Sequence, residues 1–460
     1  MAKSFTNLDT ATAVETAKAI AGGYVSALEA CDAAIDRIER RNEAVNAVII
    51  QDFDRARDNA SKLDKFRAAG DQRSLLGVPM TVKESIDVEG LPSSWGFPAS
   101  ASNFAERDSV ATYRLKSAGA IILGKTNIPV ALADWQSDSP VYGRTVNPYD
   151  HARSPGGSSG GAAAALATGM IPLEVGSDIG GSVRIPAHFC GVFGHKSTYG
   201  IIPMKGHEYP GADAMPPELA VLGPLARSAG DLAIALDVLT GPLDTSPYAL
   251  TLPVAPQKPL SEYRVLVLDE HPAIETDRMI NEPLNLLAEN LENVRVSIIR
   301  EVKGTPDLAA AHSSYRHMLL SIITRDMPGG TPVDAHGWMD LKDQQMRCAR
   351  QWNEVFKHVD VVLTPPFGVT AFPHDDNPDW GARRLVINSK EEPYGTQVAW
   401  PGLATFPGLP ATVAPIGYTD SGLPIGVQIV GASYNDHTTI EFASLLEREG
   451  LTGSALYNAG

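Results

Sequence analysis

Apolar side chains recur at helical spacing through the first fifty residues of the chain. Val14 and Ile20 belong to one such series, and a second series runs over residues 28–38 before a charged segment. Residues three or four positions apart lie on one face of a helix, so each series predicts an amphipathic helix. The adjacent Gly22 and Gly23 predict a break between the two helices.

Short apolar runs rich in β-branched residues alternate with helical patterns along the rest of the chain. The predicted helices cover residues 52–69, 109–117, 161–167 and 228–239. The predicted strands cover residues 77–88, 120–123, 170–176, 263–268, 294–299, 359–366 and 424–431, the first of them interrupted by a lysine. Strands that alternate with helices predict an α/β fold, in which helices cover both faces of a sheet.

Composition and charge narrow the class of protein. The chain has 460 residues, 43% hydrophobic and 20% charged, and its net charge of −16 argues against nucleic acid as a partner, because phosphate binding requires a basic surface. No run approaches the length of a membrane span, and the first twenty residues lack the pattern of a signal peptide. Cys31, Cys190 and Cys348 form no CxxC pair, which suits a reducing compartment. We therefore expect a cytoplasmic protein that binds neither nucleic acid nor membrane.

Two well-known motifs occur in the chain, and neither fits its context. "GAIILGKT" at 119–126 has the spacing of a phosphate-binding loop, but its variable positions have the composition of a strand core, and Pro129 follows where a helix would begin. "GGSSG" at 156–160 matches a GxSxG nucleophile elbow, but a polar loop precedes it instead of a strand. The histidines show neither HExxH nor HxH spacing, so the sequence predicts no metal site.

Two serines in glycine-rich surroundings are candidates for covalent catalysis. Ser158 and Ser182 lie 24 residues apart, and Ser182 follows an Ile-Gly-Gly turn. Successive backbone N–H groups at such a turn can converge on an anion, as an oxyanion hole requires. Without a suitable histidine, a lysine whose pKa is lowered by burial can act as the base. Lys83 lies in the apolar run 77–88, where burial is expected, although a surface lysine at a strand edge fits the same pattern.

Several segments, taken together and in this order, resemble the amidase signature family. The segments are "GVPMTVKESIDVEG", "GGSSGG" and "GSDIGGSVRIPA", supported by "ILGKTNIP", "YGRTVNPYD", "GPLARSAGDLAIALDVLTG", "GLPATVAPIG" and "LPIGVQIVG". The resemblance covers nearly the whole chain and includes the serine spacing. It implies a single domain over 1–460 with a mixed twisted sheet, an N-terminal helical region over about 1–70 and catalytic motifs at 75–235. It also implies an amidase that hydrolyses linear amides without a metal or organic cofactor.

The same resemblance assigns roles to individual residues. Ser182 is expected to be the nucleophile, Lys83 the base, and Ser158 the bridging serine, joined to Gly157 by a cis peptide bond. Neutral Lys83 would take a proton from Ser158 while Ser158 takes one from Ser182, whose oxygen attacks the carbonyl. The relay would then return a proton to the leaving amine, which is a poor leaving group until it is protonated. The backbone N–H groups expected to form the oxyanion hole are those of Ile179, Gly180, Gly181 and Ser182.

Three neighbours of these residues are expected to support the set. Asp178 is expected to hydrogen-bond groups of the turn, and Arg184 to pair with a carboxylate or with carbonyls behind it. Ser159 is expected to brace the backbone rather than to react. Simple packing is the alternative for each of the three.

Substrate specificity is expected to lie in the walls of the pocket. Aromatic side chains near the matched motifs predict a site for an apolar acyl or aryl group, although each of them fits a core position equally well. The predicted pocket residues are Trp135, Gln136, Tyr199, Trp400 and Phe406. The expected partner is a small-molecule amide, with esters and carbamates as alternatives, and a homodimer is left open.

Two other functions fit parts of the sequence. The first is the amidase subunit of a tRNA-dependent amidotransferase, which releases ammonia from glutamine. Residues 201–215, "IIPMKGHEYPGADAM", depart from the serine-rich, "SSLDQ"-like stretch expected in such a protein. The second is a catalytically silent binding or scaffold homologue. The intact set of Lys83, Ser158 and Ser182 argues against it, since a silent homologue has no need of all three.

Overall fold

Capping boxes begin the two N-terminal helices. The computed structural model describes residues 7–68, 70–212, 215–325, 327 and 329–452, so parts of the predicted 1–70 region and of the 201–215 insert lie outside the described residues. Thr12 opens α1 (Ala13–Ala21) and Ser26 opens α2 (Ala27–Val45), each by exchanging hydrogen bonds with a glutamate three residues on. The two predicted helices and the break between them are confirmed.

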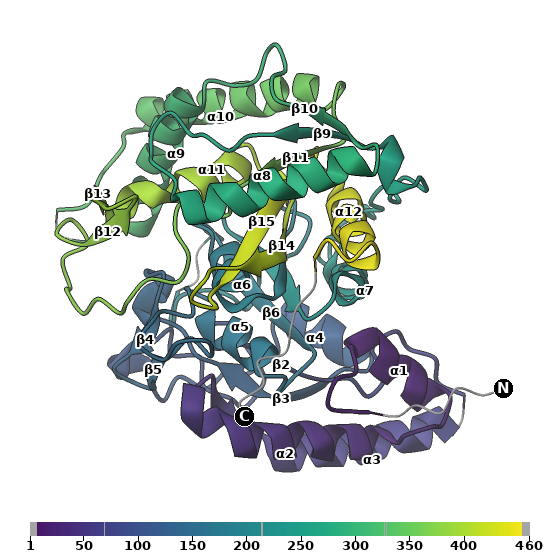
Figure 1. Cartoon of the computed structure of the whole chain (residues 1–460). Coiled ribbons are helices and arrows are strands. Elements are labelled where there is room, and N and C mark those ends of the chain that lie inside the picture. The colour runs from purple at the N-terminus through teal and green to yellow at the C-terminus, as the bar shows by residue number, and fades with distance from the viewer. Residues whose placement is uncertain (1–6, 69, 213–214, 326, 328, 453–460) are drawn as a thin grey trace.

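The centre of the molecule is a mixed sheet of 11 strands in the described part of the chain (Figure 1). The strands are β1 (Val48–Gln51), β2 (Pro79–Lys83), β3 (Ile121–Thr126), β6 (Leu173–Asp178), β7 (Phe193–Lys196), β8 (Val221–Ala226), β9 (Arg264–Val267), β10 (Ser297–Ile299), β11 (Val361–Thr364), β14 (Ala411–Tyr418) and β15 (Pro424–Val430). Their order is β1-β3-β2-β6-β8-β7-β14-β15-β11-β9-β10. Strands β3, β2 and β6 are parallel near one end and β11, β9 and β10 near the other, and antiparallel pairs join the two groups.

Helices cover both faces of this sheet, which confirms the predicted single-domain α/β fold. The helices other than α1 and α2 are α3 (Phe53–Ala68), α4 (Val110–Ser117), α5 (Gly160–Ala167), α6 (Arg184–Cys190), α7 (Ala229–Leu239), α8 (Arg278–Asn293), α9 (Leu308–Ile323), α10 (Ala335–Val355), α11 (Ala399–Thr405) and α12 (Asp436–Arg448). Short 3-10 helices cover Pro98–Ser100, Val130–Leu132, Leu260–Glu262 and Tyr394–Val398, and two small hairpins pair β4 (Ser137–Ser139) with β5 (Gly143–Thr145) and β12 (Arg384–Ile387) with β13 (Lys390–Pro393).

Successive residues of the strands contribute to different apolar clusters, because strand side chains point alternately to opposite faces. On β3, Ile122 packs in a cluster with residues of α1, α4, α7, α8 and α12. Ile121 and Leu123 pack on the other face, with residues of α2, α3, α5 and α6. This alternation fixes which strand residues point toward each helix layer.

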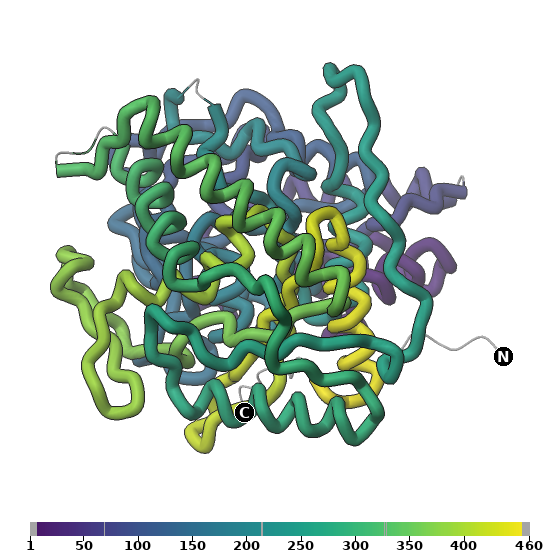
Figure 2. The backbone as a smooth tube through the Cα atoms, turned by 90° about the horizontal axis from the view of Figure 1, so that it is seen from above, coloured from purple at the N-terminus to yellow at the C-terminus, as the bar shows by residue number. Residues whose placement is uncertain are grey.

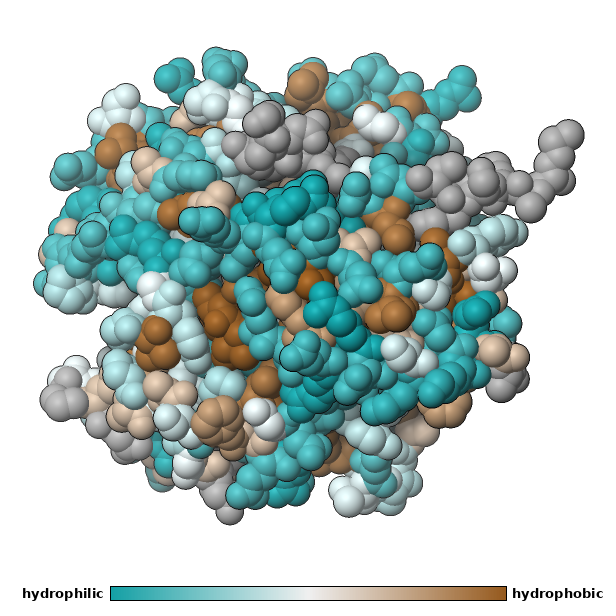
Figure 3. Space-filling view, turned by 90° about the horizontal axis from the view of Figure 1, so that it is seen from below, coloured by the Kyte–Doolittle hydropathy of each residue, from teal (hydrophilic) through white to brown (hydrophobic). Residues whose placement is uncertain are grey.

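A third apolar cluster includes residues of β9 and β11 and joins them to residues of α9, α10 and α11. Seen from above, α9 and α10 lie in front of the sheet (Figure 2). Seen from below, hydrophilic side chains cover most of the surface, with apolar ones in a few small groups (Figure 3). None of the helices in the described ranges is long and apolar enough to cross a membrane.

Two sequence predictions about strands are settled by this fold. The predicted strand 77–88 is shorter than expected: β2 ends at Lys83, and the chain turns there because the N–H of Ile86 donates to the Lys83 carbonyl. The segment 119–126 contains strand β3, as its composition predicted. Lys125 is enclosed in that strand, with Nζ 2.5 Å from the Pro92 carbonyl oxygen and 2.8 Å from Ser93 Oγ.

Candidate active site

Lys83 and the glycine-rich turn meet because their strands are parallel neighbours. Strand β2 ends at Lys83, strand β6 ends at Asp178, and Val82 lies opposite Val175. The carboxyl ends of parallel strands lie at the same edge of a sheet, which is where α/β proteins commonly bind ligands. Two segments that are distant in the sequence are thereby brought to one place.

Ser158 reaches the same place from a third segment, just before α5. Its peptide bond to Gly157 is cis, as the resemblance implied. A Cβ atom at Gly157 would lie 2.3 Å from the Asp134 carbonyl oxygen and 2.4 Å from that of Gln136, so only glycine fits there. The loop 134–136 thus fixes the path of the chain that presents Ser158.

The Lys83 amine is buried among hydroxyl groups. Its Nζ lies 2.7 Å from Ser158 Oγ, 3.0 Å from Ser177 Oγ and 3.4 Å from the Ser177 carbonyl oxygen. Desolvation lowers the pKa of Lys83 to about 7, against the opposing charges of Asp178 and Glu174. A large share of the amine is therefore neutral near pH 7 and able to accept a proton. Ser177 was not predicted as a site residue, since a strand serine carries no signal of its own.

A buried carboxyl group lies close to this lysine. Glu174, on β6, is fully buried, and the hydroxyls of Thr81 and Thr126 donate to its two oxygens. Desolvation raises the pKa of Glu174 to about 8, although these hydrogen bonds and the charge of Lys83 oppose the rise. Its charge state is therefore linked to that of Lys83, and the sequence motifs did not indicate it.

Asp178 holds the turn that precedes Ser182. Its carboxylate accepts the N–H of Gly181 at 2.9 Å and that of Val183 at 3.0 Å, and it forms a fully buried ion pair with Arg184 at 2.8 Å. Burial opposes ionisation of Asp178, but Arg184 and the backbone donors hold its pKa at about 2. Arg184 also donates to the carbonyl of Pro401 at 2.8 Å. The contacts predicted for Asp178 and Arg184 are therefore present.

The hydrogen bonds of the turn correct the predicted set of oxyanion donors. The Gly181 N–H is engaged by Asp178 and is not free to bind another anion. Within the described residues, the N–H groups of Ile179, Gly180 and Ser182 donate to no protein acceptor. Three of the four predicted donors thus remain available.

Ser182 and Ser158 share one cavity. The N–H of Ser159 donates to the Ser182 carbonyl at 3.2 Å, which ties the two serine segments together, and Ser159 Oγ lies 3.5 Å from the Ser177 carbonyl oxygen, the bracing position predicted for it. Both Ser158 and Ser182 line a cavity of about 550 Å³.

The walls of this cavity are mainly apolar. Trp135, one of the predicted pocket residues, forms part of the lining, and the tilted ring of Trp380 packs near it with ring centroids 5.5 Å apart. Helix α9 supplies three further apolar residues of the lining, Leu319, Ile322 and Ile323. Sequence reasoning missed this helix, because nothing in its local pattern indicates that it reaches a site formed by residues 83–182.

The other four predicted pocket residues lie outside this lining, which corrects their assignment. Trp400 and Phe406 are buried in the third apolar cluster, as the core alternative held. Gln136 is buried and exchanges hydrogen bonds with the backbone of Asp375 at 2.9 and 3.0 Å, so it joins two loops. Tyr199 is 38% exposed at the surface. Proximity to a motif in the sequence did not amount to proximity in space.

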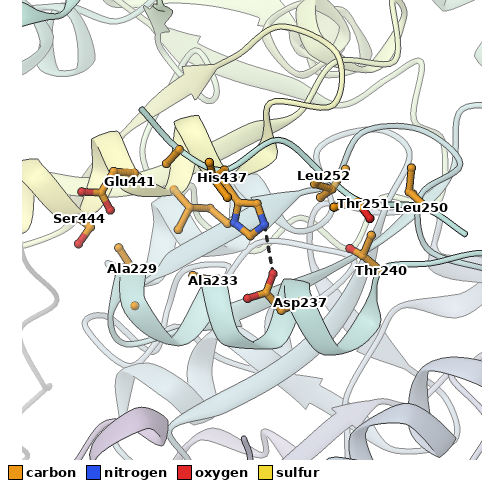
Figure 4. A pocket seen from close by; sticks show the side chains of 14 residues that line it. Ala229, Ala233, Asp237, Thr240, Leu250, Thr251, Leu252, His437, Glu441 and Ser444 are labelled. Carbon is orange, nitrogen blue, oxygen red and sulfur yellow. Dashed lines mark ion pairs between the residues drawn. The ribbon is translucent and has the colours of Figure 1, made fainter. Parts of the chain in front are cut away.

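A second cavity, of about 490 Å³, lies between α7 and α12 (Figure 4). His437 and Asp237 both line it and pair at 3.1 Å, and the hydrogen bond that His437 donates to Asp237 raises the pKa of His437. None of the predicted site residues lines it. Among the residues described, no group of three or more His, Cys, Asp or Glu side chains is arranged to hold a metal ion. The cavity shared by Ser158 and Ser182 is therefore the candidate active site.

Comparison with known proteins agrees with the fold and with the residues gathered at this site. The family model described as amidase matches residues 29–327 and 316–440. The indoleacetamide hydrolase of Bradyrhizobium diazoefficiens is 32% identical, over 97% of this chain and 88% of that protein. A glutamyl-tRNA(Gln) amidotransferase subunit of Prochlorococcus marinus strain SARG is 30% identical, over 93% of this chain and 94% of that protein.

Solved structures share the architecture. A bacterial aryl acylamidase of the amidase signature family superposes with a TM-score of 0.82, covering 95% of this chain and 96% of that one at 24% identity. The chain belongs to the amidase family. It is an enzyme of the amide-hydrolase class.

Proposed function

We propose that this enzyme cleaves carboxylic amides through an acyl-enzyme on Ser182, with Ser158 as the bridging serine and Lys83 as the base. The observation that carries the proposal is the 2.7 Å contact between Lys83 Nζ and Ser158 Oγ, in a buried site whose cavity Ser182 also lines. A lysine with a pKa of about 7 can accept the proton of the serine hydroxyl next to it, and here that serine lines the cavity that a substrate would enter.

The reaction begins with two coupled proton transfers. Neutral Lys83 accepts the proton of Ser158 Oγ while Ser158 accepts the proton of Ser182 Oγ, and the Ser182 oxygen bonds to the carbonyl carbon. The carbonyl oxygen becomes an oxyanion that the N–H groups of Ile179, Gly180 and Ser182 stabilise.

The second half of the reaction reverses the relay. The proton held by Lys83 passes through Ser158 to the leaving nitrogen, the C–N bond breaks, and the amine departs from the acyl-enzyme. Water then attacks the acyl carbon, gives up its proton to the same relay and releases the carboxylic acid. Protonation of the nitrogen matters most, because an amine leaves poorly without it.

We propose that the acyl part of the substrate is apolar and large enough to bear an aromatic ring. Trp135, Leu319 and Ile322 supply the apolar walls that such a group would fill, and burial of its surface would provide binding energy. The relative named indoleacetamide hydrolase is in keeping with this choice. Esters and carbamates can form the same acyl-enzyme and are secondary substrates of the proposal.

A second candidate is release of ammonia from glutamine, as in the tRNA-dependent amidotransferases. The 30% identity to one of their subunits favours it. The mainly apolar lining counts against it, because burial of a zwitterionic head among apolar side chains is costly, although Asp134 and Arg316 are charged members of the lining. An aryl amide and glutamine, tested side by side, separate the two functions.

We also propose that the enzyme works in a reducing compartment such as the cytoplasm. Cys31, Cys190 and Cys348 are all buried and unpaired, and desolvation raises the pKa of Cys31 to about 12. Buried thiols of this kind persist where disulfide formation is not favoured.

Labelling of the nucleophile tests the mechanism directly. A fluorophosphonate probe is expected to modify Ser182, as mapped by mass spectrometry, and Ser182→Ala is expected to lose both labelling and turnover. Ser159→Ala is the control from the same cavity region, and it should keep the label on Ser182. Labelling at another serine, or turnover that survives in Ser182→Ala, would overturn the assignment. Hydrolysis of glutamine alone would move the function to that of an amidotransferase component.

A further inference from the structure

Two buried side chains hold the carbonyl groups of the turn that carries the oxyanion donors. The Tyr315 hydroxyl, from α9, donates to the Ile179 carbonyl at 2.6 Å, and Trp135 Nε1 donates to the Gly180 carbonyl at 3.0 Å. Tyr315 is fully buried and Trp135 is 4% exposed, so both donor side chains are shielded from water. Neither contact is part of the catalytic relay proposed above.

These contacts fix the orientation of two consecutive peptide groups. In a trans peptide the C=O and N–H bonds point in opposite directions. The Gly180–Gly181 peptide is held at both ends, by Trp135 at its carbonyl and by Asp178 at its N–H. The Ile179–Gly180 peptide has its carbonyl directed at Tyr315. Its N–H, belonging to Gly180, therefore points away from Tyr315.

That opposite side is the side of the cavity. Gly180 and Ile179 line the cavity, whereas Tyr315 does not. The N–H of Gly180 has no acceptor within the described residues, so it is free to meet a substrate oxygen. We infer that Tyr315 and Trp135 are positioning residues, which aim the Gly180 N–H at the oxyanion by holding the carbonyls on either side of it. The inference rests on the proposed function of Ser182.

The Tyr315 side chain is itself held firmly. A Cβ atom at Gly402 would lie 2.4 Å from the Tyr315 ring, so the glycine lets α11 approach the ring closely. On the same helix α11, Thr405 Oγ1 accepts from Arg184 at 2.7 Å and donates to the Pro401 carbonyl at 3.0 Å. Arg184 in turn pairs with Asp178, which accepts the Gly181 N–H of the turn.

Helix α9 also connects this clamp to the substrate. Tyr315 and Leu319 are four residues apart and Ile322 follows one turn later, so all three lie along one side of the helix. Leu319 and Ile322 line the cavity, while Tyr315 holds the turn. An acyl group packed against this side of α9 therefore contacts the same helix that carries Tyr315, and this contact is expected to stabilise the position of the oxyanion donors. We expect larger apolar acyl groups to raise kcat as well as lower KM.

The test compares two buried Tyr→Phe substitutions. Tyr315→Phe removes the hydroxyl that holds Ile179 and leaves the ring. Since loss of one oxyanion donor costs about 10²–10³-fold in kcat, and here a donor is misaimed rather than removed, we expect kcat to fall about 10- to 100-fold with KM nearly unchanged. Tyr263→Phe is the matched control: Tyr263 is also fully buried, and its hydroxyl has no partner among the described residues, so kcat should not change.

Inhibitor binding separates positioning from a general structural role. An arylalkyl boronic acid forms a tetrahedral adduct with the nucleophile, and its affinity is expected to fall in Tyr315→Phe by the same factor as kcat/KM. The parent hydrocarbon fills the cavity without an adduct, and its affinity should stay the same. The advantage in kcat of a large acyl amide over a small one should shrink in the same variant.

Two results would overturn the inference. One is wild-type kcat and boronic-acid affinity in a folded Tyr315→Phe enzyme, and the other is an equal loss of boronic-acid and hydrocarbon binding. If Tyr315→Phe does not fold, Trp135→Phe decides: the ratio of boronic-acid to hydrocarbon affinity is expected to fall, and an unchanged ratio contradicts the clamp. The proposed function fails by a different result, namely turnover that survives in Ser182→Ala.

Discussion

Lys83 and Lys125 are buried on adjacent parallel strands, yet their surroundings differ in the one respect that matters for catalysis. Desolvation lowers the pKa of Lys83 to about 7 and that of Lys125 to about 8, so both amines lose much of their basicity. Lys125 lies opposite Val82, the neighbour of Lys83, and successive strand residues point to opposite faces of a sheet. The two amines therefore reach different places.

The two amines differ in whether their hydrogen-bond partners line the cavity. Lys83 Nζ contacts Ser158, which lines the cavity. Lys125 Nζ contacts the Pro92 carbonyl and the Ser93 hydroxyl, neither of which lines it. Burial sets the pKa of a lysine, whereas access to the hydroxyl next to the substrate decides whether the lysine can act as a base.

The largest effect is expected from Lys83→Met. Methionine is close in length to lysine and apolar, so the buried site keeps its packing while the amine is lost. Because a general base contributes about 10²–10⁴-fold to rate, kcat/KM on an aryl amide is expected to fall by a factor in that range. Steady-state kinetics measure the loss, and thermal unfolding shows that the protein stays folded.

Lys125→Met is the matched control for this substitution. It should keep the wild-type kcat/KM, because its amine touches no cavity residue. Its effect should appear in stability, since the Pro92 carbonyl loses its donor and an unsatisfied buried group destabilises by about 1–3 kcal/mol. Equal losses of activity in the two variants would contradict the distinction between the two lysines.

A smaller effect on kcat/KM is expected when the second hydroxyl near Lys83 is removed. Each of the two lysines contacts such a serine hydroxyl, so the two serines can be compared. Ser177→Ala removes the group 3.0 Å from Lys83 Nζ, and loss of one hydrogen bond worth about 1 kcal/mol corresponds to roughly 5-fold in kcat/KM. Ser93→Ala removes the hydroxyl 2.8 Å from Lys125 Nζ and should leave kcat/KM unchanged. Steady-state kinetics of the two variants measure this difference. A loss of kcat/KM in Ser93→Ala and none in Ser177→Ala would argue against a role for Ser177.

Local motifs predicted which groups meet at the candidate site, because the position of each group depends on its immediate neighbours. The cis bond before Ser158 follows a glycine that no other residue can replace, and the turn before Ser182 is built from glycines that Asp178 can cap. Lys83 lies at the end of a strand whose apolar sequence buries it. In each case the residues that determine the position of the group lie within a few positions of it in the sequence.

The walls of the cavity could not be predicted in the same way. Leu319 and Ile322 belong to a helix that follows Ser182 by more than a hundred residues, and only the order of strands in the sheet brings the two together. Trp400 and Tyr199 were chosen because they adjoin motifs, yet one is a core residue and the other lies at the surface. Packing between distant elements leaves no local pattern.

The smallest expected effect is a displacement of the pH profile of kcat/KM, caused by a change at Glu174, the buried carboxyl group near Lys83. The protonated amine cannot accept a proton, so kcat/KM should rise with pH through about 7 and level off above it. His207 also lines the cavity, but burial lowers its pKa to about 3, so it does not produce that limb. The pKa of Glu174 is about 8, so only a fraction of this carboxyl is ionised while Lys83 titrates, and that fraction favours the charged lysine. Glu174→Gln removes it, and the limb should therefore move slightly to lower pH. Asp87→Asn is the control, because Asp87 raises the pKa of Lys125 rather than that of Lys83, and the limb should stay in place. A limb that moves to higher pH in Glu174→Gln would mean that the lysine with a pKa near 7 is not the base.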